Sequence, residues 1–313
     1  MSSPPPTLLA VPNASEGRDL DVVEAIAAAF AGATERKDAG RAPVRLLDVH
    51  ADPDHNRSVF TLAAPQGDVA PALVAGAREA VRRIDLRRHG GLHPRVGALD
   101  VAPVVYLDDP DRGAACAEAL TAAALIGEEL ELPVVLYGDL ATAPERRERA
   151  PLRTGGPAAL AERLMRDDLA PDFGPRAHPS AGTVLVTARR PLVAFNLDLA
   201  TDDLALARRV AAELREAGGG LSGVRALGLF LPARGRAQVS VNVHDHRRAP
   251  LAEVVARVRD RAPVSEAELV GLAPAAALEG FPADVPLRGF DPERHVIENA
   301  LRSTPEGPDK GDG

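Results

Sequence analysis

The sequence predicts an α/β (α+β) protein made of two ferredoxin-like βαββαβ subdomains, with their sheets facing each other and their helices outside. Three observations lead to this prediction. Apolar residues indicate the same order of strands and helices twice along the chain. Two sheets that are each backed by helices leave two uncovered faces, which can pack toward each other around a cleft. A chain of 313 residues that is 45% hydrophobic can bury the core that two such units need.

The first half of the chain predicts one complete unit, followed by a further helix and strand. Runs of β-branched and aromatic residues indicate strands, and apolar residues at helical spacing, such as Val23, Ile26 and Phe30, indicate helices. The elements of the unit are a strand at 8–11, a helix at 19–33, strands at 44–50 and 57–64, a helix at 67–84 and a strand at 101–107. A helix at 111–130 and a strand at 134–137 extend it.

The second half repeats this order after a polar stretch, rich in proline and glycine, at 139–182. Its elements are a strand at 191–199, a helix at 202–217 capped by Thr201, strands at 224–231 and 236–243 that form a hairpin, a helix at 251–261 and a strand at 269–272. The chain is therefore divided into an N-terminal subdomain at 1–180, a C-terminal subdomain at 181–280 and a partly disordered tail at 281–313. Only 295–302 of that tail has a weak helical pattern.

Composition excludes several classes of protein. A net charge of -8 with 3% aromatic residues gives neither the basic surface nor the stacking side chains of a nucleic-acid binder. No apolar run approaches the roughly 20 residues that cross a bilayer, and the first residues lack the basic and apolar regions of a secretory signal. The single cysteine, Cys116, excludes an intrachain disulfide. We therefore expect a cytoplasmic enzyme that acts on small molecules, without nucleic-acid or membrane partners.

Polar residues gather in three segments next to predicted strands, at 11–17, 50–57 and 87–100. Loops at strand ends are where rigid folds present reactive groups. In the third segment, Gly90 and Gly91 allow close approach of the backbone, and Pro94 restrains His93 to an extended conformation. A histidine titrates near neutrality, so His93 is a candidate proton shuttle. The residues alone leave open whether His93 and Arg95 have this role or only cap a loop.

A metal site is an alternative interpretation of the second segment. His50, Asp52, Asp54 and His55 could supply nitrogen and oxygen ligands for a metal-dependent amidohydrolase. No other segment provides an obvious partner with ligand spacing, and Asp-Pro-Asp-His is also ordinary turn chemistry.

Taken in order, these segments resemble the glutamate formimidoyltransferase family, which includes the transferase half of formimidoyltransferase-cyclodeaminase. The resemblance covers roughly 7–278, and its most specific part is His-Pro-Arg-Val-Gly-Ala-Leu-Asp at 93–100. Further matching segments are Val-Pro-Asn-Ala-Ser-Glu-Gly at 11–17, Leu-Leu-Asp-Val at 46–49, Asp-His-Asn-Arg-Ser-Val at 54–59, Ile-Asp-Leu-Arg at 84–87, Pro-Asp-Phe-Gly-Pro at 171–175 and Ala-Gln-Val-Ser-Val-Asn at 237–242. The resemblance implies transfer of the formimidoyl group from N-formimidoyl-L-glutamate to N5 of tetrahydrofolate, the co-substrate, with release of L-glutamate in histidine breakdown.

The resemblance also implies a homodimer and a set of site residues. His93 would be the general acid and base, with Asp48 or Asp100 as an orienting acid. The expected substrate ligands are Asn13, Glu16, His55, Asn56, Arg57 and Arg95, of which the arginines can bind carboxylates. The expected folate ligands are Gly174, Pro175, Ser180 and Gly182.

The sequence departs from the family pattern at Ala14, Leu92, Gly156 and Ala181, which removes an acid and aromatic surface near the expected ligands. Three hypotheses follow: a folate-dependent formimidoyltransferase, the metal-dependent amidohydrolase, and a paralogue that binds folate or a carboxylated ligand without turnover.

Overall fold

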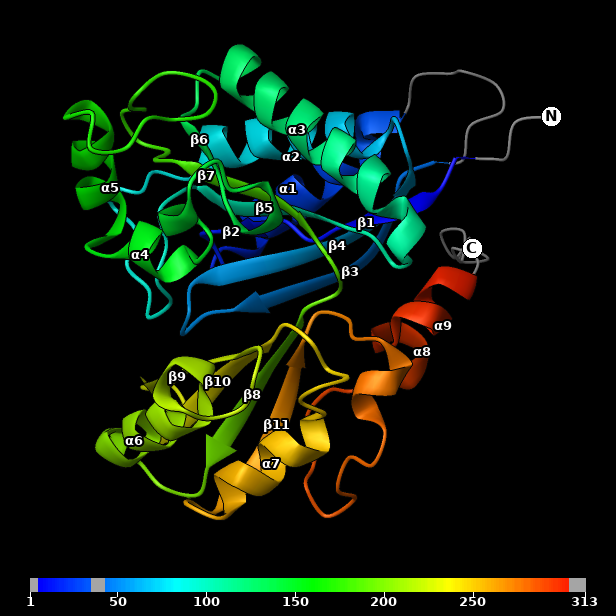
Figure 1. The fold of residues 1–313 in the computed structure, drawn as a ribbon, viewed down its shortest axis with the longest axis vertical. Coiled ribbons are helices and arrows are strands. Elements are labelled where there is room, and N and C mark those ends of the chain that lie inside the picture. The colour runs from blue at the N-terminus through cyan, green and yellow to red at the C-terminus, as the bar shows by residue number, and fades with distance from the viewer. Residues whose placement is uncertain (1–4, 35–42, 304–313) are drawn as a thin grey trace, which may run out of the picture.

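The computed structural model describes residues 5–34 and 43–303, and it forms two subdomains, each a sheet covered by helices (Figure 1). The first sheet has seven strands in the order β3-β4-β1/β2-β5-β7-β6. Its strands are β1 Thr7–Ala10, β2 Asn13–Ala14, β3 Arg45–Asp52, β4 Arg57–Pro65, β5 Leu99–Val105, β6 Val134–Leu136 and β7 Val184–Arg189. The pairings around β1 are antiparallel, whereas β7 runs parallel to both β5 and β6.

Three helices cover one face of the first sheet: α1 Leu20–Ala31, α2 Val69–Arg83 and α3 Arg112–Glu129. The side chain of Asp19 caps α1 by accepting a hydrogen bond from the Val22 backbone N–H at 3.2 Å. Phe30 of α1 and Phe60 of β4 are fully buried between the layers, with ring centroids 5.2 Å apart. The apolar face predicted for this helix is therefore the face that packs on the sheet.

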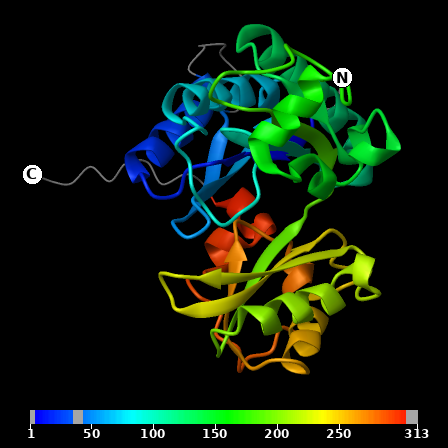
Figure 2. The same cartoon turned by 90° about the vertical axis from the view of Figure 1, so that its left-hand side faces the viewer.

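The second sheet has four antiparallel strands in the order β11-β8-β10-β9. Its elements are β8 Val193–Leu199, α6 Leu204–Leu214, β9 Val224–Leu231, β10 Arg236–Val243, α7 Leu251–Arg259 and β11 Val264–Val270. Figure 2 shows α6 and α7 on the side of this sheet away from the first subdomain. Within the first sheet, the neighbouring strands β5-β1-β4-β3 correspond in chain order to β11-β8-β10-β9 of the second sheet. The two ferredoxin-like units are therefore confirmed.

The polar stretch at 139–182 contains structure that the sequence did not predict. It includes the helices α4 Arg149–Arg153 and α5 Gly156–Met165, whose buried residues Leu152, Leu160 and Leu164 form a separate small core. Strand β7, directly after it, was also not predicted. Because β7 belongs to the first sheet, the two sheets divide the chain between Arg189 and Val193 rather than at 180. Short 3-10 turns complete the described structure at Gly32–Thr34, Asp109–Asp111, Gly138–Leu140, Pro144–Arg146, Glu216–Gly218 and Ala275–Leu278.

The segment after the second sheet returns to the first subdomain and ends in α8 Pro292–His295 and α9 Ile297–Arg302. The guanidinium of Arg45 donates hydrogen bonds to the carbonyls of Leu301 and Ala300 at 2.9 and 2.8 Å. Ile297 packs with residues of the first sheet and with Leu272. The predicted tail is thus ordered and packed as far as 303, while 304–313 lie outside the described residues. Within the described ranges, no helix is long and apolar enough to span a membrane.

Candidate active site

The loop that carries His93 is fastened to the turn between β3 and β4 by Asn56. The Asn56 side chain accepts a hydrogen bond from the Gly17 N–H at 2.9 Å and donates one to the Gly90 carbonyl at 3.1 Å. Its backbone has a φ of +48°, a left-handed conformation that asparagine tolerates better than most residues. Asn56 therefore joins all three polar segments that the sequence singled out.

Two other expected substrate ligands are engaged by their own loops. The Arg95 guanidinium donates hydrogen bonds to the carbonyls of His89 at 2.8 Å and Gly91 at 3.2 Å. Glu16 Oε1 accepts hydrogen bonds from three successive backbone N–H groups, Gly17 to Asp19, at the start of α1. Both side chains hold the segments around the site in place.

Gly91 lies where the His93 loop touches the β3–β4 turn. A Cβ atom at Gly91 would come within 2.4 Å of the His55 carbonyl oxygen and 2.9 Å of Asn56 Cβ. At the neighbouring Gly90 it would meet nothing within 4 Å, so this position is a matched control. We expect Gly91→Ala to lower the free energy of unfolding by about 1–3 kcal/mol, as overpacking does. Urea denaturation measures this change, and kcat/KM shows whether the shifted loop also affects activity. Equal losses of unfolding free energy in Gly90→Ala and Gly91→Ala would contradict the close contact at Gly91.

His93 lies at the wall of a large cavity between the subdomains. Its Nδ1 atom is buried and has no hydrogen-bond partner among the described residues, and the same holds for Nε2 of His55. The two imidazole rings lie 6.0 Å apart, tilted by 44°. Burial lowers the pKa of His93 well below 6.5, and the positive charges of Arg57 and Arg153 lower it further. His93 is therefore a neutral imidazole at pH 7, able to accept a proton.

Asp100 lies beneath this site and is held by two arginines. It is fully buried, and its Oδ2 accepts hydrogen bonds from Arg57, at 2.8 Å, and from Arg153. Its Oδ1 accepts one from the Val96 N–H at 2.7 Å. Burial alone would raise the pKa of Asp100, but Arg153 and Arg57 outweigh it and keep that pKa below its ordinary value. The two oxygens of Asp100 thus hold arginines and a backbone N–H, and they make no hydrogen bond to His93 in the described structure.

Arg57 is also bound to Asn13, the first residue of β2. Its Nε and Nη2 atoms donate hydrogen bonds to Asn13 Oδ1 at 3.1 and 2.6 Å. With Asp100 on the remaining nitrogen, the guanidinium of Arg57 is satisfied within the protein. Arg57 therefore contributes a positive charge to the site, but none of its nitrogen atoms is left without a partner to bind a substrate carboxylate.

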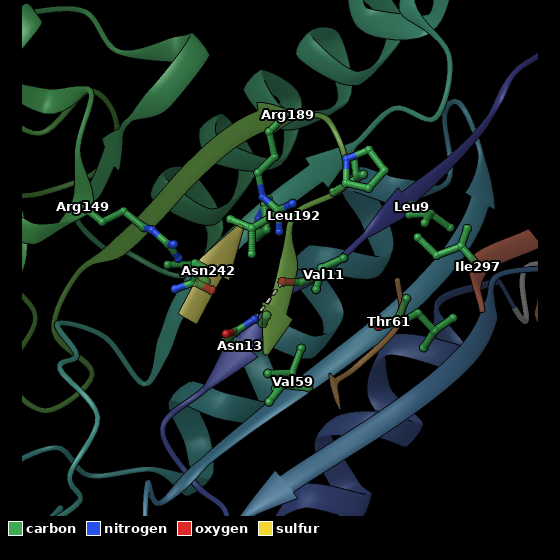
Figure 3. A pocket seen from close by; sticks show the side chains of 17 residues that line it. Leu9, Val11, Asn13, Val59, Thr61, Arg149, Arg189, Leu192, Asn242 and Ile297 are labelled. Carbon is green, nitrogen blue, oxygen red and sulfur yellow. Dashed lines mark hydrogen bonds between the residues drawn. The ribbon is translucent and has the colours of Figure 1, made fainter. Parts of the chain in front are cut away.

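The cavity beside His93 has a volume of about 640 Å³ and is built from both subdomains. The segment around α4 forms one side, and the inner faces of β9 and β10 form the other. Its polar and charged lining residues are His93, Glu148, Arg149, Arg153, Thr154, Arg215, Glu216, Arg225, Ser240, Asn242 and His244. Figure 3 shows a smaller adjoining cavity, in which Arg149, Asn242 and Asn13 lie close together between the two sheets. A cleft between subdomains, as the sequence predicted, is present.

Several expected site residues lie away from this cavity. Asp48 lies on β3 next to α8, where burial raises its pKa and His295 lowers it. None of the four expected folate ligands lines the cavities near His93. Gly174 packs against the Leu132 carbonyl behind the first sheet, and Gly182 packs against the Val96 carbonyl.

The four residues of the metal hypothesis do not converge. His50 Nε2 lies 4.0 Å from Glu268 of the second sheet, and Asp52 accepts a hydrogen bond from the His55 backbone N–H at 2.8 Å. Within 5–34 and 43–303, no group of three or more His, Cys, Asp or Glu side chains is arranged to hold a metal ion.

The sequence patterns did not identify the polar side chains that α4 and β10 contribute to this cavity. Ser240, Asn242 and His244 alternate with buried valines along and just beyond β10, and they face the cavity. Polar residues at every second position of a strand indicate a polar face, and this signal was present in the sequence. For Arg149 and Arg153 there was no such signal, because they lie on a short helix in a region rich in proline and glycine.

Comparison with known proteins gives matches along nearly all of the chain. The model of the N-terminal subdomain of the formiminotransferase domain matches residues 7–189, and that of the formiminotransferase domain matches 194–281. The chain is 37% identical to glutamate formimidoyltransferase of Streptococcus pyogenes serotype M1, covering 93% of this chain and 97% of that protein. It is 36% identical to glutamate formimidoyltransferase of Thermoplasma acidophilum, covering 93% and 96%. It is also 39% identical to formimidoyltransferase-cyclodeaminase of Sus scrofa, covering 86% of this chain and 50% of that protein.

Proposed function

The chain belongs to the formiminotransferase family, and we propose that it transfers the formimidoyl group of N-formimidoyl-L-glutamate to N5 of tetrahydrofolate, releasing L-glutamate. The observation that carries the proposal is a half-buried, neutral His93 in the wall of a cavity lined by arginines. The cavity volume of about 640 Å³ is within the range of small-molecule sites. Both substrates end in a glutamate group, so both are anions at pH 7.

The charge of the site supports an anionic substrate. Arg57 and Arg153 share one carboxylate, Asp100, which leaves a net positive charge next to His93. Arg149 adds a third guanidinium, and it has no carboxylate within 4.0 Å among the described residues. Cations held in a partly desolvated cleft attract a ligand with two carboxylates and orient it.

His93 is proposed to carry one proton through the reaction. The lone pair of N5 attacks the formimidoyl carbon, and the proton on N5 passes to the imidazole. The bond between that carbon and the glutamate nitrogen then breaks, as the imidazolium returns the proton to the departing amine. A low pKa suits the second step, because the imidazolium formed beside Arg57 and Arg153 is a stronger acid than a solvated one.

A two-substrate assay tests this function. We expect the purified protein to consume N-formimidoyl-L-glutamate only when tetrahydrofolate is present, with release of one L-glutamate per modified folate. The folate absorbance spectrum and a coupled glutamate assay follow the two products. Consumption of the donor without folate would instead support an amidohydrolase, and binding of folate without turnover would support the inactive paralogue.

The proposal also includes the assembly and the compartment. We propose a homodimer, which is common in the family, acting in the cytoplasm. Light scattering on the purified chain tests the assembly.

A further inference from the structure

Arg149 and Arg189, near the His93 cavity, have no carboxylate within 4.0 Å in the part of the chain that the structure describes. Arg149 is the first residue of α4, and Arg189 is the last residue of β7. Neither forms an ion pair within the described part of the chain, and the Arg189 guanidinium donates a hydrogen bond to the Arg190 carbonyl at 3.0 Å. Figure 3 shows their side chains extending into the same space near Asn242. Two segments far apart in sequence thus direct guanidinium groups to one place.

Tyr137, directly after β6, lies beside both arginines. The guanidinium carbon of Arg149 lies 5.8 Å from the centre of the Tyr137 ring, within the range of a cation–π contact. Tyr137 also lies close enough to Arg189 to influence its pKa, and both residues line the same cavity. Tyr137 is buried, so this arrangement is part of the built structure rather than a loose surface cluster.

A second cavity, of about 510 Å³, opens beside these arginines and shares Glu148, Arg149 and His244 with the His93 cavity. The two acids in its lining are already paired with other arginines. Glu148 accepts hydrogen bonds from Arg225 at 2.6 and 3.1 Å, and Asp139 lies 3.4 Å from Arg112. The positive charges of Arg149 and Arg189 are therefore left without a partner.

The electrostatics of neighbouring groups agree with this geometry. Burial lowers the pKa of Arg189 to about 10. His244 lines both cavities, whose walls displace part of its water. This desolvation and the positive charges of Arg149, Arg189 and Arg225 lower the pKa of His244 to about 4. A desolvated cation without an anion costs stability, and a bound carboxylate would offset that cost.

We propose that Arg149 and Arg189 form the subsite that binds the carboxylates of a glutamate group. This inference rests on the proposed function for the choice of ligand, and it assigns carboxylate binding to these two residues instead of Arg57 and Arg95, whose donors are already engaged. The glutamate group can come from the donor or from the end of the folate, and the two sources are separable.

Binding of two probes tests the subsite without any turnover. L-glutamate represents the donor, and p-aminobenzoyl-L-glutamate represents the end of the folate. For at least one probe, we expect Arg149→Gln and Arg189→Gln to raise Kd by about 10- to 100-fold, as loss of charged hydrogen bonds does. Arg190→Gln is the matched control, because Arg190 is the next residue, exposed, and paired with Asp109 at 2.5 Å. It should change either Kd by less than about threefold.

The outcome of these measurements decides both the source and the subsite. Weaker binding of L-glutamate alone assigns the subsite to the donor, and weaker binding of the other probe alone assigns it to the folate. Unchanged Kd values in both variants, or no measurable binding of either probe to the unsubstituted protein, would overturn the proposal. If formimidoyl transfer is absent but probe binding responds as expected, the proposed function fails and the subsite stands.

A stability measurement separates ligand binding from a structural role. Since Arg189 is half-buried and has no anion, Arg189→Gln should leave the thermal midpoint of the free protein unchanged or higher. A large fall in this midpoint, together with weaker binding, would indicate that Arg189 supports the fold instead.

Discussion

Replacing His93 by alanine is expected to lower kcat by about 10²- to 10⁴-fold, the usual contribution of a general acid and base. The substituted enzyme loses the group that takes the proton from N5 and returns it to the leaving amine. The KM values for both substrates should change much less, because the arginines that attract the carboxylates remain. Steady-state kinetics in both substrates measures the two effects separately.

Two further readouts distinguish a proton shuttle from a loop residue. Added imidazole should restore part of the activity of His93→Ala, because the space left by the side chain opens to the cavity. In the unsubstituted enzyme, the neutral form of His93 is the active base, and its pKa lies well below 6.5. The value of kcat/KM should therefore be constant near neutrality and fall only at lower pH. Near-normal turnover by a folded His93→Ala protein would refute the assignment.

Replacing Asp100 by asparagine is expected to reduce the free energy of unfolding by about 3–5 kcal/mol, the usual cost of breaking a buried ion pair from one side. The carboxylate is fully buried and bonds two arginine side chains that are each 9% exposed. Without it, both guanidinium charges would be buried next to each other with no anion. Urea denaturation, with a check that the m value is unchanged, measures the loss.

A surface ion pair provides the control for Asp100. Glu129 pairs with Arg78 at 2.6 Å, but the two side chains are 44% and 48% exposed. Glu129→Gln should change the free energy of unfolding by no more than about 1 kcal/mol. A combined Asp100→Asn and Arg153→Met variant should be less destabilised than Asp100→Asn alone, since it removes one of the two uncompensated charges. Equal stability of the Asp100→Asn and Glu129→Gln proteins would contradict the role assigned to Asp100.

Leu92 is a departure from the family pattern that lies directly next to His93 in the sequence, so it bears on the pKa of His93. An acidic residue at this position would place an anion next to the imidazole and favour its charged form. Here the side chain is apolar and 39% exposed. The groups with the largest electrostatic effect on His93 are instead Arg57 and Arg153, and both lower its pKa. Binding of an anionic substrate would offset their charge, so the pKa of His93 is expected to rise in the complex.

Local sequence patterns determined the elements of both subdomains and the segments that meet at the site. Helical spacing located the buried face of α1, and strand runs located β4 and β10 within two residues of their bounds. The three polar segments that the sequence singled out do lie together, because Asn56 bonds Gly17 and Gly90. These features depend on the helix and strand propensities of the residues and on the spacing of apolar residues, both of which are local properties of the sequence.

Only the tertiary structure decided what each polar side chain binds. Spacing could not show that Arg57 and Arg153, 96 residues apart, share Asp100 (153 − 57 = 96), or that Arg95 holds its own loop while Arg149 and Arg189 have no carboxylate partner among the described residues. It also missed β7, whose parallel pairing with β5 joins residues 84 positions apart (185 − 101 = 84). Such contacts form only when the whole sheet and the second subdomain are in place, since the free energy that selects them comes from long-range packing and shared charge rather than from local conformation.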